Sequence, residues 1–127
     1  MFDWKNFFEY AVYVNGKADD FPDKEACYRT VVSRAYYAAY HISKIFAEQK
    51  NGGLRFHSNE HQQVQNFFKG QKHDRRLTKI GSQLTRLHQD RKKADYIDDL
   101  NESPSMKAGK TIKWANEIIS AIDSLSI

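Results

Sequence analysis

The sequence predicts an all-α domain, an up-and-down bundle of four to five helices. Apolar residues recur at the three- and four-residue spacing of helices along most of the chain, and signals for β-strands are nearly absent. Only two prolines and six glycines interrupt the 127 residues. This length fits one domain, which we place at residues 1–127. Short connections between long amphipathic helices favour antiparallel neighbours.

The first two predicted helices cover about residues 3–14 and 22–50. The apolar face of the first consists of Trp4, Phe7, Phe8 and Ala11. Gly16 is expected just past its end, because glycine adopts the backbone conformation that closes many helices. The second helix has Pro22 in its first turn and stops before Gly52. At 1.5 Å per residue it is about 43 Å long and forms the spine of the bundle.

The other three predicted helices cover about residues 59–69, about 74–99 and the segment that opens at Ser103. We expect Ser58 to cap the third helix, because a serine oxygen accepts hydrogen bonds from the free N–H groups of a first turn. Ser103 followed by Pro104 predicts the start of the fifth. The residues predicted to point inward from the fifth helix are Ile112, Ala115, Ile119, Ile122 and Leu125.

The single cysteine and the absence of a long apolar run favour a cytoplasmic protein. Cys27 is the single cysteine, so an internal disulfide is impossible, and we expect it in the core. No apolar run approaches the roughly 20 residues of a membrane span, so we expect no membrane partner. His57 and His61 lie four residues apart, but no cysteine or carboxylate pattern completes a metal site. We therefore predict neither a metal nor another cofactor.

Positive charge is concentrated between Lys69 and Lys93. This segment contains nine basic and two acidic residues, so its net charge is +7. The whole chain carries only +4. A basic stripe on one helix is typical of a nucleic-acid interface, and equally of a solvated helix face. The candidates for contacting nucleic acid are Tyr37, Lys72, Arg75, Arg76, Lys79, Arg86, Lys92 and Lys93.

Two arginines interrupt the apolar seams of the longest predicted helices. One seam passes through Leu77, Ile80, Leu84, Leu87, Arg91, Ala94 and Asp98. The other passes through Cys27, Val31, Arg34, Ala38, His41 and Ile45. His88 and Asp95 lie three residues before and four after Arg91, so they share its face. Arg34 and His41 are accordingly predicted at inward or boundary positions.

Two interpretations of these charges remain open. In the first, Arg34 and Asp95 form an ion pair that fixes the register of the helices, with Tyr37 or Tyr96 satisfying the remaining donors. In the second, the residues form a site for phosphate. Arginine binds phosphate with two parallel hydrogen bonds, and histidine transfers protons near neutral pH. Both interpretations place the cluster between the two longest helices.

Two short segments resemble a known family. Residues 33–41 read S-R-A-Y-Y-A-A-Y-H, and residues 91–96 read R-K-K-A-D-Y. Together they resemble HEPN-domain proteins, most closely a small stand-alone prokaryotic subfamily with the motifs S-R-x-Y-Y-A-x-x-H and R-x-x-A-D-Y. The resemblance extends from about Glu25 to the last helix. It implies a HEPN-like bundle of four or five helices that is commonly a homodimer.

The resemblance also implies a chemistry. Many relatives are metal-independent ribonucleases in which the ribose 2′-hydroxyl attacks the adjacent phosphate, with arginine stabilising charge and histidine transferring a proton. Their motif places a histidine shortly after an arginine, whereas no histidine follows Arg91 in this chain. His41 stands at a comparable distance after Arg34. The expected catalytic residues are Arg34, His41, Arg91, Asp95 and Tyr96.

We therefore expect an RNA-directed HEPN protein, a metal-independent ribonuclease or an RNA-binding component of a toxin–antitoxin or defence system. The alternative is a non-catalytic HEPN interaction module. Such a module would bind a nucleotide or a small nucleotidyltransferase partner, and its Arg/Asp/Tyr cluster would be structural. The expected partners are RNA or a nucleotide, a second copy of the chain, and an antitoxin or nucleotidyltransferase.

Overall fold

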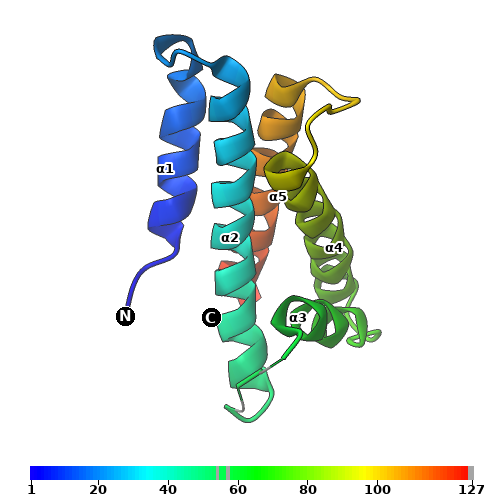
Figure 1. Cartoon of the computed structure of the whole chain (residues 1–127). Helices are drawn as coiled ribbons and strands as arrows, with labels where there is room; N and C mark the ends of the chain where they lie inside the picture. Colours follow the sequence, from blue (N-terminus) through cyan, green and yellow to red (C-terminus); the bar gives the residue numbers. More distant parts are fainter. Residues whose placement is uncertain (54, 57, 126–127) are drawn as a thin grey trace.

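The computed structural model describes residues 1–53, 55, 56 and 58–125, and it confirms the predicted all-α class. The described residues form five α-helices, one 3₁₀ helix and no strand. The helices are α1 (Lys5–Gly16), α2 (Lys24–Lys50), α3 (Glu60–Lys69), α4 (Arg75–Tyr96) and α5 (Pro104–Leu125), and the 3₁₀ turn η1 covers Ala18–Asp20. In Figure 1, α1, α2, α4 and α5 alternate in direction, and the short α3 crosses one end of the bundle. No helix of the described segments is long and apolar enough to span a membrane.

The start of α2 shows how local sequence sets a helix boundary. Asp23 is its N-cap, and one of its carboxylate oxygens accepts a hydrogen bond from the backbone N–H of Ala26 at 3.1 Å. Such a cap satisfies one of the donors left free in the first turn. The helix therefore begins two residues later than predicted, and Pro22 precedes it. At the other end Gly52 has a φ of +69°, a left-handed conformation suited to glycine.

Two predicted boundaries near α3 and α4 are wrong. Ser58 is not the N-cap of α3; Asn59 occupies that position in a left-handed conformation and makes no side-chain cap. The fourth helix ends at Tyr96 rather than near Asp99. There the guanidinium of Arg29, on α2, donates to the carbonyl oxygens of Ala94, Ile97 and Asp98 at 2.6–3.0 Å. The first of these bonds satisfies a carbonyl of the last turn, and the other two hold the chain just beyond the helix end.

The core lies between α2 and the helices that surround it. Cys27 is buried, as predicted, and the seam of α4 is buried at Ile80, Leu84, Leu87 and Ala94. Arg34 contradicts the seam predicted for α2 because it is exposed, with its guanidinium above the ring of Phe7 at 5.5 Å. The guanidinium is open to water there and rests on the face of the aromatic ring, so its charge is not buried.

Helices α3 and α4 approach closely at Gly81. A Cβ atom built on Gly81 would lie 2.8 Å from Lys69 Cγ and 2.9 Å from the Lys69 backbone nitrogen. Both distances are shorter than normal non-bonded contacts, and the second involves backbone that a rotamer change does not move. Glycine at this position therefore determines how near α3 can lie to α4.

We expect Gly81→Ala to destabilise the protein by about 1–3 kcal/mol, the usual cost of overpacking a core. Alanine stabilises the interior of a helix by roughly 0.5–1 kcal/mol relative to glycine, but the clash with Lys69 outweighs that gain. Urea unfolding followed by circular dichroism measures the change. Gly109→Ala in α5 is the matched control. The added Cβ atom meets nothing within 4 Å there, so this substitution should stabilise the protein. Equal effects at the two positions would contradict the close approach.

Candidate functional site: a histidine, arginine and tyrosine cluster

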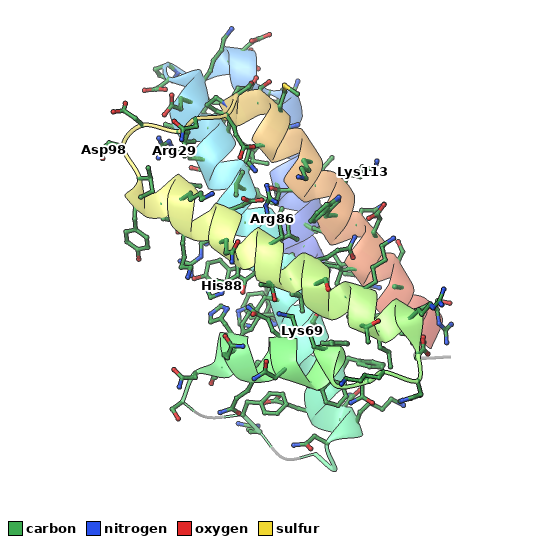
Figure 2. All side chains as sticks on the ribbon, turned by 90° about the vertical axis from the view of Figure 1, so that its right-hand side faces the viewer. Arg29, Lys69, Arg86, His88, Asp98 and Lys113 are labelled. Carbon is green, nitrogen blue, oxygen red and sulfur yellow. The ribbon has the colours of Figure 1, made fainter. Side chains whose placement is uncertain are left out.

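Three helices bring aromatic and imidazole rings together in one cluster. Helix α2 supplies Tyr36, Tyr37, Tyr40 and His41, α3 supplies His61, and α4 supplies His88 and Arg91. We call this set the ring cluster. In Figure 2, His88 extends from α4 into the space between α4 and α3. The cluster thus forms where the short α3 crosses the end of the bundle.

His61 and His88 stack on each other, although 27 positions separate them in the chain. Their ring centroids lie 4.5 Å apart with an interplanar angle of 9°. The hydroxyl of Tyr36 shares a hydrogen bond with Nδ1 of His61. Nε2 of Gln65 donates to Nδ1 of His88 at 3.2 Å, so a neutral His88 carries its proton on Nε2. These bonds fix the orientation of both imidazoles.

Arg91 places its guanidinium against the tyrosine faces of the ring cluster. The guanidinium carbon is 5.2 Å from the ring centre of Tyr37 and 5.9 Å from that of Tyr36, within the range of cation–π attraction. Nη1 donates to the carboxylate of Asp95, one helical turn away, at 3.3 Å. The buried Nε has no hydrogen-bond partner among the described residues. The side chain is only 12% exposed, so its charge acts in a partly desolvated site.

Burial disfavours the protonated form of the imidazoles in the ring cluster and lowers their pKa values. It lowers the pKa of His88 to about 4, and the nearby His61 and the cationic Lys92 and Arg91 act in the same direction. Burial and Arg91 likewise lower the pKa of His61. The pKa of His41, which stacks on Trp4 with centroids 3.7 Å apart, is lowered chiefly by burial.

These lowered pKa values predict that acid weakens the fold. Between about pH 6.5 and pH 4 the unfolded chain binds protons at positions such as His88 that the folded chain leaves neutral, so stability falls as the pH falls through this window. Urea unfolding at pH 7.5 and pH 5 measures the loss. In His88→Gln the loss should be smaller, and His73→Gln, at an exposed histidine, should behave like the wild type. A stability that rises toward pH 5 would contradict the assignment.

The sequence-predicted catalytic residues do not all meet. Of these, His41, Arg91 and Asp95 lie in or beside the ring cluster, as does Tyr37, which was predicted to contact nucleic acid. Arg34 lies over Phe7 of α1, so the predicted Arg34–Asp95 ion pair is wrong, and Asp95 pairs with Arg91 instead. Tyr96 is 74% exposed at the end of α4 and supplies no donor to the cluster.

The basic residues of α4 lie mostly on another side of the helix. Arg86 and Lys93 stand two residues from His88 and Arg91, and side chains two positions apart point to opposite sides at about 100° per residue. Arg75 and Lys79 fall on the same stripe as Arg86. Lys92, four residues after His88, is the candidate on the side of the ring cluster. The exposed candidates outside the cluster's side are Lys72, Arg75, Arg76, Lys79, Arg86 and Lys93.

Sequence reasoning missed His61 and the importance of His88. The spacing from Arg91 already placed His88 on the arginine's face, which was a usable signal. Nothing in the sequence indicates that α3 turns His61 toward α4, because that depends on how two helices pack. His57, the other histidine considered for a metal, lies outside the described residues. The described part of the chain contains no group of three or more His, Cys, Asp or Glu side chains that could hold a metal ion.

Comparison of the chain with protein-family models, with curated proteins and with solved structures found no match. The HEPN resemblance consequently stays a prediction based on two short motifs.

Proposed function

We propose that this chain is an RNA-directed protein of HEPN type and that its ring cluster is the site of metal-independent RNA cleavage. The observation that carries the proposal is the meeting of His61, His88 and Arg91 at one partly buried place. Two imidazoles and a guanidinium are the groups that phosphate binding and proton transfer require. The neighbouring Tyr37 and Lys92 add an aromatic face and a further positive charge.

The geometry suggests a division of roles. His88 accepts a hydrogen bond at Nδ1, so its Nε2–H is free to donate to a phosphate oxygen. The hydroxyl of Tyr36 can accept as well as donate, so His61 can keep its proton on Nδ1 and act as a base at Nε2. In the proposed reaction His61 Nε2 removes the proton of a ribose 2′-hydroxyl, and the 2′-oxygen bonds to the adjacent phosphorus to form a 2′,3′-cyclic phosphate. The bond from phosphorus to the 5′-oxygen breaks, and the departing 5′-oxygen takes a proton from water. Arg91 stabilises the negative charge that develops.

Cleavage of labelled single-stranded RNA and tRNA in EDTA tests the proposal. We expect cleavage by the wild type and a loss of about 10²–10⁴-fold in His61→Ala, the usual contribution of a general base. His88→Ala should weaken RNA binding as well as cleavage. His73→Ala is the matched control, because His73 is exposed and lies outside the ring cluster. Cleavage that requires a divalent cation, or that survives in His61→Ala, would contradict the proposed mechanism.

A non-catalytic interaction module is the second candidate, and a specific observation favours it. The imidazoles already have partners inside the fold, since Tyr36 binds His61 and Gln65 binds His88. Such bonds are also what a purely structural polar cluster would form. In that case His61→Ala would lower the free energy of unfolding, and the wild type would show no cleavage. Binding of RNA that weakens steeply with added salt would then indicate recognition of RNA without cleavage.

A further inference from the structure

A shallow hollow lies on the outer face of α4, next to the ring cluster. Its volume is about 330 Å³, and its lining residues are Gln89, Lys92, Lys93, Tyr96 and Ile97. The first four stand at positions i, i+3, i+4 and i+7, so they share one face of the helix. They belong to the last turns of α4, between the labels of His88 and Asp98 in Figure 2. Lys92 follows His88 by four residues, about 6 Å along the helix axis, so the hollow borders the ring cluster.

Tyr96 lines this hollow with an exposed aromatic ring. The residue is 74% exposed, and no other ring or cation among the described residues packs on it. Tyr13 is also exposed, but Lys17 lies over its ring at 5.9 Å. Nucleobases stack on such aromatic side chains with little regard to sequence, because every base has a π-face. The ring of Tyr96 is therefore available to one unstacked base.

Two lysines beside Tyr96 have charges that no carboxylate neutralises. The ammonium groups of Lys92 and Lys93 form no ion pair among the described residues, because the nearest acidic residues of α4, Asp90 and Asp95, pair with arginines. The acidic residues that follow the helix do not line the hollow. A phosphate bound here would therefore meet two ammonium groups and no carboxylate.

The remaining lining residues suit a nucleotide as well. Gln89 is exposed, and its amide offers both a donor and an acceptor to the edge of a base. Ile97 adds apolar surface for a base or a ribose. An acidic protein segment would use the lysines and leave the ring of Tyr96 unused, whereas a nucleotide of single-stranded RNA uses both.

We propose that this hollow binds a nucleotide of single-stranded RNA beside the scissile phosphate, with its base stacked on Tyr96 and a backbone phosphate held by Lys92 and Lys93. The proposal rests on RNA cleavage at the ring cluster, because a strand held there passes over the last turns of α4. Tyr96, predicted from the sequence as a catalytic residue, thus binds substrate and takes no part in proton transfer.

Fluorescence anisotropy of the full chain with a labelled 2′-O-methyl RNA hexamer of alternating adenosine and cytidine tests the stacking. The methyl group blocks the 2′-oxygen nucleophile, so this probe is bound without being cleaved. We expect Tyr96→Leu to weaken binding about 5- to 100-fold, the usual effect of losing one stacked base. Tyr96→Phe retains the ring and should bind like the wild type. Tyr13→Leu, at another exposed tyrosine beside a lysine, is the matched control. Unchanged binding in Tyr96→Leu, or an equal loss in Tyr13→Leu, would overturn the proposal.

Lys92→Gln combined with Lys93→Gln tests the phosphate contact. Each phosphate of a single strand contributes about 0.7 to the slope of log Kd against the logarithm of the salt concentration. We expect this double variant to lower the slope by about 0.7, because one phosphate contact is lost. Lys110→Gln combined with Lys113→Gln removes the same charge from α5 and should leave the slope unchanged. The same slope in all three proteins would contradict the phosphate contact.

These measurements separate the nucleotide site from the cleavage on which it rests. Loss of cleavage in His61→Ala together with unchanged binding in Tyr96→Leu would overturn only the nucleotide site. Binding that depends on Tyr96 without any cleavage would support the site and overturn the cleavage. Hexaglutamate that binds as tightly as the RNA hexamer, and equally well to Tyr96→Leu, would assign the lysines to an acidic protein partner and overturn the proposal.

Discussion

Arg91→Gln is expected to lower the rate of RNA cleavage by roughly 10²–10³-fold, the range for removing one preorganised donor from developing negative charge. Among the described residues, Arg91 is the one arginine whose guanidinium faces Tyr36 and Tyr37 of the ring cluster. Glutamine retains a polar side chain of similar reach and loses the positive charge. The rate of cleavage at saturating RNA measures the effect. Arg91→Lys should restore only part of the rate, because an ammonium lacks the two parallel donors of arginine.

The same variant separates a functional role for Arg91 from a structural one. Its partner Asp95 is partly exposed one turn along the helix, and such pairs contribute only about 0.3–0.5 kcal/mol. The cation–π contacts with Tyr36 and Tyr37 are lost as well, so we expect Arg91→Gln to lower the free energy of unfolding by no more than about 2 kcal/mol. Lys113→Gln, at an exposed position of α5, is the control for loss of one positive charge (Figure 2). Unchanged cleavage, or a large loss of stability, would remove Arg91 from the proposed site.

Lys107→Met is expected to cost about 3–5 kcal/mol of stability, the usual effect of removing one partner from a buried ion pair. The side chain of Lys107 is 8% exposed, and its ammonium lies between Asp90 and Glu102. Methionine retains most of the apolar stem, so the loss reports mainly on charge. Asp90 would keep only the 3.4 Å contact with Arg86. Urea unfolding of the variant measures the change.

Two further variants show whether the effect comes from the buried pair. Lys113→Met makes the same substitution at an exposed position of α5 and should change stability by less than about 0.5 kcal/mol. Asp90→Leu combined with Lys107→Met removes both charges, and this double variant should recover much of the loss, because an apolar pair needs no ionic partner. A cost below about 1 kcal/mol for Lys107→Met would mean that the pair behaves as an exposed one.

Local sequence was enough to predict the helices and three members of the ring cluster, namely Tyr37, His41 and Arg91. The apolar seam of α4 is regular, so it identified Arg91 as a charge at an inward position, and the structure leaves that side chain mostly buried. The apolar seam of α2 predicted an inward or boundary position for Arg34 as well, but that side chain is exposed. An apolar seam shows which face of one helix points inward, whereas the exposure of an arginine at the edge of that face depends on the neighbouring helix. Here the guanidinium of Arg34 lies over Phe7 of α1.

The sequence by itself determined the all-α class, the five helices to within a few residues, and the face on which Arg91 lies, because these depend on spacing and caps within a few turns. The tertiary structure alone decided that His61 stacks on His88, that Gly81 admits α3 so close to α4, and that Asp90 is buried beside Lys107. Each of these contacts joins different helices. Their geometry depends on how helices pack, and the periodicity of a single helix carries no information about it.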